Sequence, residues 1–431
     1  MRSGVILAQP FADAIRRGAD ALAAALCLLV LSPLLFVRGV LAWWRTGTVF
    51  TRTPQVGRFR MPFNRFAFAG DGVGRALPVL INVVRGDLAF AGPRALTEAE
   101  AVAVPPWAWT RFAVRPGLVS PHTVRRRVGV AYENEAEHDQ EFVYTETLGG
   151  NVGLVARSLP GLLLGGGGER PALPRLDFFG VPVVNTTMDE ALDWIVDRAG
   201  SAPAAQLAFV NPDCLNIAYV REDYREVLRH VARVLPDGIG LQIGCRFLDA
   251  SLVANVNGTD LFPRLCERLA GTELSLFLLG ARPGVADAVA ANMVAQHPGL
   301  RVAGTQHGYF SPEEEPAVIE AINRSGANVL LVAFGAPRQE LWLAAHLAEL
   351  RPGVCMGVGG LFDFYSGRIP RAPAWVREIG FEWVWRLWQE PRRMWRRYVV
   401  GNPLFLYRVW QQVRGAAGPG ASPPADREGR P

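Results

Sequence analysis

The sequence predicts an α/β protein of 431 residues, in which a doubly wound, mostly parallel sheet follows a small membrane-associated α+β domain with a re-entrant helix. From residue 176 onward, short apolar β-branched runs alternate with longer segments of helical spacing, and glycine-rich turns separate them. Residues 21–37 are instead almost continuously apolar. A stretch rich in glycine and proline, residues 164–175, reads as a linker between the two parts, so the first domain is expected over residues 1–163.

The apolar segment Ala21–Val37 is 17 residues long, which is the short limit for a helix that crosses a bilayer. Ser32 and Pro33 interrupt it, and a proline inside a helix breaks or kinks that helix. We therefore expect a kinked, re-entrant helix rather than a straight span. A secretory signal is the alternative, but no small-x-small cleavage pattern precedes the folded part.

Charge and cysteine content narrow the class of protein. The net charge is only +5, and arginine supplies all 45 basic residues because the chain has no lysine. Basic groups cluster in one tryptophan-rich stretch near the C-terminus, so we expect no nucleic-acid partner. The five cysteines form no Cys-x-x-Cys pair, which indicates reduced thiols at a cytoplasmic face and no structural zinc site.

Strands and helices alternate along the second domain. A strand within residues 178–184 precedes a helix that Thr187 caps, with Glu190 three residues later. The pattern further predicts strand Gln206–Val210, helix Cys214–Arg233, a strand-like segment at 235–244, strand Leu274–Leu279, the turn Gly280–Gly284, helix Val285–Gln296, short strands near Arg301 and Val329, a helix from Gln339 and strand Val354–Gly357.

Two of these strands end in glycine turns. Gly335, Ala336 and Pro337 follow the apolar run 327–333, and Gly359-Gly360 follow Val354–Gly357. A strand–glycine turn–helix junction directs backbone N–H groups and the positive helix end at one point, which suits phosphate. Ordinary α/β construction produces the same pattern without a ligand, so this alternative stays open here.

The C-terminal stretch combines arginine with tryptophan. Arg386, Arg393 and Arg397 fall at i, i+7 and i+11, so they share one helical face if Pro391 only kinks the helix. This density of guanidinium groups beside aromatic rings favours a diphosphate at a membrane surface over a solvated helix face. The last residues, 415–431, are too polar and too rich in proline and glycine to fold alone.

Four motifs carry a resemblance to the WecG/TagA/CpsF family of bacterial glycosyltransferases. They are GAPRQELW at Gly335–Trp342, GVGGLFDFYSG at Gly357–Gly367, RAP at Arg371–Pro373 and FEWVWRLWQEPRRMWRRY at Phe381–Tyr398. The resemblance spans about residues 176–398 and implies a Rossmann-like glycosyltransferase domain over residues 176–380 with an Arg/Trp-rich helical appendage over residues 381–414. The family moves a sugar from a nucleotide donor onto a polyprenyl-diphosphate-linked sugar.

The resemblance also implies the site residues. Asp237 matches the family's Asp-Gly and is the expected general base, although Asp-Gly is also a common turn. The expected donor and nucleotide contacts are Asn211, Gly258, Thr259, Asp260, Gly280, Gly335, Pro337, Gln339 and Glu340. The arginines expected to hold the acceptor diphosphate are Arg386, Arg393 and Arg396. Thr259 or Asp260 capping a helix and Glu340 capping another are the alternatives.

The first domain resembles the bacterial sugar transferases that move a phosphosugar onto polyprenyl phosphate. ALPVLINVVRGDLAFAGPR at Ala76–Arg94 and RFAVRPGLVSP at Arg111–Pro121 carry this resemblance. That family places its nucleophilic Asp-Glu pair where Arg75 and Ala76 stand, and neither residue can attack phosphorus. We therefore expect an inactive domain. Asp71 or Asp87 acting as a substitute nucleophile, which would make the enzyme bifunctional, is the alternative.

These observations predict an inverting glycosyltransferase of exopolysaccharide or capsule synthesis. Its partners would be a UDP-sugar donor, of N-acetylmannosamine, uronic acid or hexose type, a polyprenyl-diphosphate-linked acceptor and the cytoplasmic face of the bacterial inner membrane. The chain contains no Asp-x-Asp, so we expect no metal or other cofactor. A homo-oligomer is possible on the family's pattern, and a non-catalytic scaffold of polysaccharide assembly is the competing interpretation.

Overall fold

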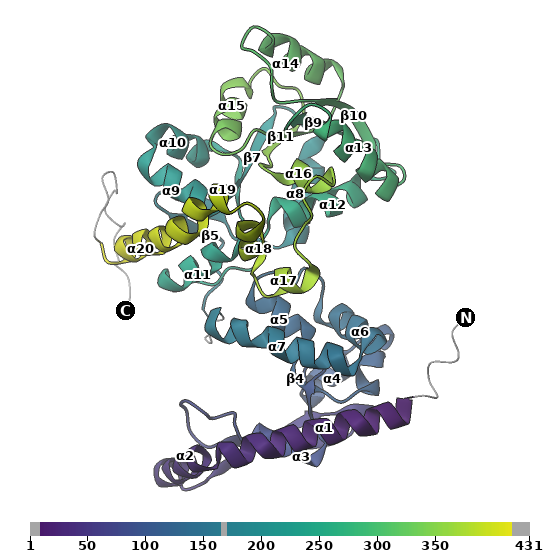
Figure 1. Ribbon diagram of the computed structural model, residues 1–431, viewed down its shortest axis with the longest axis vertical. Coiled ribbons are helices and arrows are strands. Elements are labelled where there is room, and N and C mark those ends of the chain that lie inside the picture. The colour runs from purple at the N-terminus through teal and green to yellow at the C-terminus, as the bar shows by residue number, and fades with distance from the viewer. Residues whose placement is uncertain (1–8, 165–169, 416–431) are drawn as a thin grey trace. The chain divides into compact units, whose positions relative to one another are not determined.

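The computed structural model describes residues 9–164 and 170–415. The contacts divide the chain into two compact units. The first comprises residues 1–127 and 133–165, and the second comprises residues 128–132 and 166–431. Figure 1 labels many of the elements of both units. Within the predicted linker, residues 165–169 lie outside the described residues, and so does the predicted tail apart from Gly415.

The first unit is mostly helical, with an antiparallel pair β1–β2 and a parallel pair β3–β4. Its strands are β1 (Phe50–Val56), β2 (Pro62–Phe68), β3 (Ala89–Ala91) and β4 (Gly117–Val119). Its helices are α1 (Gln9–Val30), α2 (Ser32–Thr46), α3 (Val79–Arg85), α4 (Glu98–Ala103), α5 (Pro121–Arg127), α6 (Glu135–Thr145) and α7 (Leu148–Leu164), with 3₁₀ segments η1 (Arg58–Arg60) and η2 (Pro106–Ala113).

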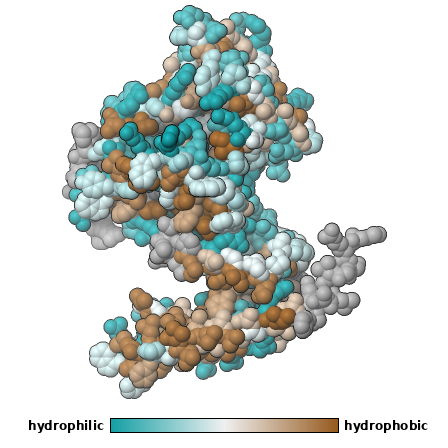
Figure 2. All heavy atoms as spheres, viewed as in Figure 1, coloured by the Kyte–Doolittle hydropathy of each residue, from teal (hydrophilic) through white to brown (hydrophobic). Residues whose placement is uncertain are grey.

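Helices α1 and α2 are separated at the predicted break. Ser32 Oγ donates to Leu29 O at 2.7 Å, and Pro33 stands in the first turn of α2, where a missing N–H is tolerated. No single helix among the described residues is long and apolar enough to cross a bilayer, whereas α1 from Ala12 and α2 together pass that test with a bend of 70°. Large apolar side chains on both helices are exposed, and Figure 2 shows hydrophobic residues gathered there.

The two carboxylates considered as substitute nucleophiles differ in their surroundings. Asp71 lies in the loop after β2, with 97% of its side chain exposed, and pairs with Arg75 at 3.1 Å. Asp87 Oδ2 accepts from the buried Asn82 Nδ2 at 3.0 Å and lies 3.4 Å from Arg85. Asp71 is thus exposed to solvent and paired with Arg75, whereas Asp87 is held against α3.

The second unit contains a six-stranded sheet in the order β10-β9-β11-β12-β7-β8. Every neighbouring pair in it is parallel, as the alternation of strands and helices predicts. The strands are β7 (Ala205–Val210), β8 (Arg233–Pro236), β9 (Ser275–Gly280), β10 (Arg301–Gln306), β11 (Val329–Ala333) and β12 (Val354–Gly357). An antiparallel hairpin, β5 (Arg175–Phe178) and β6 (Val181–Val184), precedes the sheet.

The second unit also contains the following helices, most of which cover the two faces of the sheet. They are α8 (Met188–Ala199), α9 (Pro212–Val220), α10 (Glu222–His230), α11 (Ile239–Phe247), α12 (Gly258–Leu269), α13 (Val285–Gln296), α14 (Glu315–Arg324), α15 (Arg338–His346), α16 (Leu361–Tyr365), α17 (Ala374–Glu378), α18 (Glu382–Gln389), α19 (Pro391–Trp395), the π-helical segment η3 (Arg396–Val400) and α20 (Gly401–Val413). Helix α8 begins with the predicted capping box of Thr187 and Glu190, and α13 spans the predicted residues.

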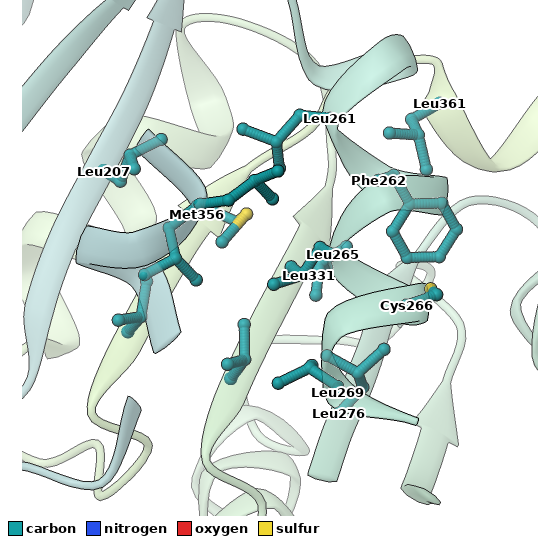
Figure 3. Close-up of a cluster of buried hydrophobic side chains, with 14 of the residues drawn as sticks. Leu207, Leu261, Phe262, Leu265, Cys266, Leu269, Leu276, Leu331, Met356 and Leu361 are labelled. Atoms are coloured by element: carbon teal, nitrogen blue, oxygen red, sulfur yellow. The ribbon is translucent and has the colours of Figure 1, made fainter. Parts of the chain in front are cut away.

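Alternation along the strands divides the core. Leu207 and Leu331 point to the face covered by α8, α12, α13 and α16, where they pack with Phe262 and Leu265 (Figure 3). Their strand neighbours point to the opposite face, covered by α9, α10, α11, α14, α15 and α20. Because a parallel strand buried on both faces has apolar residues at every position, the strands appear as continuous apolar runs.

Four predicted elements differ from the structure. The single strand predicted within residues 178–184 is instead part of the hairpin β5–β6, because Gly180, with φ +82°, allows a tight turn. The helix predicted over Cys214–Arg233 is two helices, α9 and α10, followed by β8. The predicted strand-like segment 235–244 is a strand only as far as Pro236, because Gly238 has φ +96° and helix α11 begins after it. The predicted continuous helix through Pro391 is broken, since Glu390 has φ −130° and ψ 62°. A residue before proline is disfavoured in helical geometry, which explains the break.

Candidate functional site

A pocket lies at the carboxyl ends of β7 and β8. Its empty volume, including the open solvent at its mouth, is about 930 Å³. Parallel α/β sheets bind ligands at this edge, because loops and helix N-termini converge there. Five predicted site residues line the pocket: Asn211, Asp237, Thr259, Asp260 and Arg386. Its walls also include side chains from η3 and from the segment 128–132.

Asn211 stands between the end of β7 and the start of α9. Its Oδ1 accepts hydrogen bonds from Asp213 N and Cys214 N, each at 3.1 Å, so it caps the helix. The same side chain hydrogen-bonds to the Asp237 carboxyl. Asn211 therefore ties the first turn of α9 to the carboxylate at the end of the neighbouring strand.

Asp237 follows β8 directly and is the central acid of the pocket. Its backbone N donates to Val210 O at 2.8 Å, and Gly238 N donates to Asn255 Oδ1 at 2.6 Å. Burial raises the pKa of Asp237 above its usual range, although Arg397, the hydrogen bond with Asn211 and Arg386 all oppose that rise. A carboxyl group with a raised pKa at the wall of a cleft has the properties of a general base.

Asp260 lines the pocket and anchors two ion pairs there. Asn257 caps α12 by accepting from Asp260 N at 2.8 Å, so Asn257, rather than Thr259 or Asp260, is the N-cap. The carboxyl of Asp260 pairs with Arg371 at 2.5 Å and Arg377 at 3.4 Å. Burial alone would raise its pKa, but Arg371, the hydrogen bonds and Arg377 lower it below the usual range. Asp260 is thus ionised.

Two neighbours of Asp260 have mainly local roles. Thr259 lines the pocket, and its backbone O accepts from Tyr365 Oη at 2.6 Å. Gly258 faces the Phe209 ring, since a Cβ built on it would lie 3.5 Å from that ring. Gly258 is not among the pocket-lining residues.

Arg386 and Arg397 bring positive charge to the pocket. The Arg386 guanidinium lies 4.9 Å from the Phe364 ring centroid, and its Nη2 is 3.2 Å from a Cβ built on Gly360. The buried Nε of Arg397 lies 3.5 Å from Asp213 Oδ2 and makes no hydrogen bond within the described residues. Two guanidinium groups beside an acid can bind a diphosphate and steady the charge that develops on a leaving nucleotide.

Arg393 and Arg396, predicted to hold the same diphosphate, do not line the pocket. Both are exposed, and Arg393 pairs with Glu390 at 3.4 Å. The break at Glu390 and the π-helical turn η3 rotate the later residues, so that Arg397 faces the pocket instead. The sequence places Arg386, Arg393 and Arg397 on one helical face only if Pro391 merely kinks the helix, and the break at Glu390 does not meet that condition.

The predicted glycine-loop residues lie at the same sheet edge but outside the pocket. Gly280 has φ +129°, and a Cβ on it would lie 2.7 Å from Ala333 N, so it allows close packing of β9 on β11. Gln339 Oε1 accepts from Gly335 N at 3.1 Å and Gly359 N at 2.9 Å, which joins the two loops. Pro337 precedes α15 as its N-cap residue, without a side-chain capping bond.

Glu340 is fully buried behind these loops. Its Oε1 accepts a hydrogen bond from Gln339 Nε2 at 2.7 Å. Burial raises the pKa of Glu340 to about 7, against the hydrogen bond with Gln339. Gln339 and Glu340 therefore support the loops from inside, and their contact with a nucleotide stays a prediction. Across residues 9–164 and 170–415, no three His, Cys, Asp or Glu side chains gather as a metal-ligand cluster.

Sequence reasoning missed several pocket residues. They are Val128, Val130, Arg377, Glu382, Trp383, Tyr398 and Asn402. Glu382 links to Arg371 at 3.3 Å, and the pKa of its carboxyl is raised by burial against the pull of Arg371. Most of these residues belong to the Arg/Trp-rich stretch, whose composition was a usable signal. The composition of the segment around Val128 carries no such signal.

Comparisons with known proteins match two regions of the chain. The sequence model described as "Glycosyl transferase WecG/TagA/CpsF family" matches residues 176–418, and that described as "Bacterial sugar transferase" matches residues 75–164. The N-acetylglucosaminyldiphosphoundecaprenol N-acetyl-beta-D-mannosaminyltransferase of Bacillus subtilis (strain 168) is 30% identical over 235 residues, which cover 54% of this chain and 90% of that relative. The pocket described above lies within the first match, apart from the segment 128–132.

Proposed function

Because the chain belongs to the WecG/TagA/CpsF family of glycosyltransferases, we propose that its pocket transfers a sugar from a UDP-sugar to a polyprenyl-diphosphate-linked saccharide, with inversion. The observation that supports this most is the position of Asp237. It is an acid with a raised pKa, at the carboxyl edge of a parallel sheet, with Arg386 and Arg397 beside it. This arrangement provides a base and anion-binding groups in one cleft.

In this proposal Asp237 accepts the proton of the attacking acceptor hydroxyl. Its raised pKa makes it a stronger base than an exposed aspartate, and Asn211 fixes its orientation through the end of β7. Arg386 and Arg397 neutralise negative charge as the sugar leaves its nucleotide, or hold the diphosphate of the lipid acceptor. Since guanidinium groups can supply this charge, the proposal needs no metal ion, and we expect activity in EDTA.

The donor is proposed from the relative. The Bacillus subtilis protein is named as an N-acetyl-beta-D-mannosaminyltransferase that acts on N-acetylglucosaminyldiphosphoundecaprenol. We propose a donor of the same kind, a UDP-N-acetylmannosamine, with uronic acid and hexose donors as the next candidates. A polysaccharide of the cell surface would be the final product.

The first unit is proposed as the membrane attachment. Helices α1 and α2 expose apolar side chains such as Leu29, Phe36 and Trp44, and a cleft beside them is lined by apolar residues including Leu28, Trp43 and Phe68. A bent apolar pair of this kind suits re-entrant insertion into the inner leaflet. Attachment would keep the enzyme where its lipid acceptor is concentrated.

The test is a product assay with a panel of UDP-sugars and a soluble polyprenyl-diphosphate-sugar analogue. Acceptor-dependent UDP release with one donor supports the proposal and identifies that donor. Product from polyprenyl phosphate and a UDP-sugar, without a preformed acceptor, would instead show phosphosugar transfer by the first unit. Binding of the lipid without any turnover would favour the scaffold.

A further inference from the structure

The five residues Val128–Tyr132 fold with the second unit, although the residues on both sides of them belong to the first. In sequence they lie inside the stretch that matches the bacterial sugar transferases, residues 75–164, and outside the glycosyltransferase match at residues 176–418. The pocket therefore has a wall that the glycosyltransferase match does not include.

Two valines of the segment face the proposed transferase pocket. Val128 and Val130 line the same cavity as Asp237 and Arg386. Val128 is only 2% exposed, and its Cγ1 lies 3.3 Å from a Cβ built on Gly380. Gly380 has φ +75°, so the absence of its side chain both permits the turn and leaves room for the valine. The segment is packed rather than loosely apposed.

Gly129 connects the segment to the loop that carries the proposed base. Asn255 N donates to Gly129 O at 2.8 Å, and Asn255 Oδ1 accepts from Gly238 N at 2.6 Å. Because Gly238 directly follows Asp237, Asn255 links Gly129 to the loop that carries Asp237. Gly129 has φ +73°, and a Cβ on it would lie 3.0 Å from Asn255 N. Any larger residue would strain this junction.

Tyr132 connects the segment to the ion-pair anchor. Its hydroxyl lies 2.7 Å from Asn255 O and 2.9 Å from Asp260 Oδ2, either of which can accept its hydrogen bond, and it accepts from Asn257 Nδ2 at 3.1 Å. Burial and the charge of Asp260 raise the pKa of Tyr132 well above its usual range, so the hydroxyl stays protonated. The Arg264 guanidinium lies 4.8 Å from the ring centroid.

We propose that Val128–Tyr132 is a built-in wall of the glycosyltransferase pocket, in which Gly129 and Tyr132 act as positioning residues for Asp237 and Asp260. This proposal rests on the transferase function proposed above. Gly129 holds the Asp237 loop through Asn255, whereas Tyr132 fixes the carboxylate that orients Arg371 and Arg377. Sugar transfer by this chain thus depends on residues from the stretch that resembles a different enzyme.

The experiment compares four full-chain variants. Gly129→Ala and Tyr132→Phe disturb the wall. Gly149→Ala is the matched glycine control, since a Cβ there meets nothing within 4 Å, and Tyr144→Phe is the tyrosine control, since Tyr144 is 74% exposed. The measurements are kcat for acceptor-dependent UDP release across pH, the fraction of folded protein, and amide hydrogen exchange of residues 237–241.

Gly129→Ala should lower kcat about tenfold and move the acid limb of the pH profile to lower pH. The shift follows because a loosened loop admits water to Asp237, and better solvation lowers the pKa of a carboxyl. Tyr132→Phe should lower kcat about tenfold, the usual effect of losing a hydrogen bond to a charged group. A loss of fold alone would reduce the amount of active enzyme without moving the acid limb, and both controls should match wild type.

Several results would overturn the proposal. One is an active wild type whose kcat and pH profile are matched by both Gly129→Ala and Tyr132→Phe. Another is a fall in activity that equals the fall in folded fraction, with the pH profile unchanged. If wild type releases no UDP with any donor, the transferase function itself fails, and hydrogen exchange still decides the structural claim. Faster exchange at residues 237–241 in Gly129→Ala supports the wall, and unchanged exchange contradicts it.

Discussion

Replacing Arg397 with glutamine should make the proposed base harder to ionise. The positive charge of Arg397 is the first of the influences that oppose the burial-induced rise in the pKa of Asp237. Removing a nearby opposite charge raises the pKa of a carboxyl by about one unit. Because Asp237 must be deprotonated to accept a proton, the acid limb of the kcat/KM profile should move upward by about one pH unit.

The same change removes a group available to a diphosphate. Arg397 lines the pocket, and within the described residues its 3.5 Å contact with Asp213 is an ion pair without a hydrogen bond, so its guanidinium can donate to an incoming anion. A charge-assisted hydrogen bond is worth about 1.5–3 kcal/mol, which corresponds to a loss of about 10- to 100-fold in kcat/KM on the plateau of the profile. The assay is acceptor-dependent UDP release at a series of pH values in buffers of constant ionic strength.

Arg393→Gln is the matched control, since Arg393 is exposed and pairs with Glu390. We expect its kcat/KM to stay within about twofold of wild type, as is usual for a surface charge. A profile for Arg397→Gln whose acid limb coincides with that of wild type would refute the electrostatic reasoning. Equal losses in both variants would refute the placement of Arg397, rather than Arg393, at the pocket.

Three further predictions concern stability and membrane binding. Asp260→Asn breaks a buried ion pair and should lower the free energy of unfolding by about 3 kcal/mol in urea titrations. Because the pKa of Asp260 is lowered, wild type has this contribution at neutral pH and loses it as pH falls through that pKa. Glu340 has a raised pKa of about 7, so the free energy of unfolding of wild type should fall by up to about 3 kcal/mol as pH rises from 4.5 to 7, whereas that of Glu340→Gln should not. Wild-type and variant curves of unfolding free energy against pH that run parallel would contradict this. Phe36→Glu should reduce flotation of the full chain with anionic vesicles, and Val73→Glu, an exposed site in a loop, should not; equal flotation would count against the re-entrant pair.

The sheet was predictable because its signals are local. Each buried strand is a short apolar run, and residues such as Thr187 and Glu190 mark a helix start through a pattern three residues apart. The carboxyl ends of parallel strands share one edge, so Asn211 and Asp237 could be expected to meet once β7 and β8 were recognised. The break at Ser32 and Pro33 followed from proline chemistry in the same way.

The features that the sequence could not show depend on backbone detail and long-range contacts. A π-helical turn that selects Arg397 over Arg396 leaves no mark in a periodic pattern, since both residues are arginine. Gln339 belongs to a motif shared with a family of enzymes, yet its side chain joins two loops. Tyr132 meets Asp260 across 128 positions of sequence, and no local rule links a tyrosine to a carboxylate at that distance.

Substitution of Asp237 by asparagine tests the central claim most directly, because it keeps the size of the side chain and removes the base. We predict that acceptor-dependent UDP release falls by about a hundredfold or more, while binding of the UDP-sugar measured by calorimetry stays within about twofold. The wild-type rate should not change in EDTA. An Asp237→Asn variant that releases UDP at the wild-type rate would contradict the account, and so would a wild-type rate abolished by EDTA.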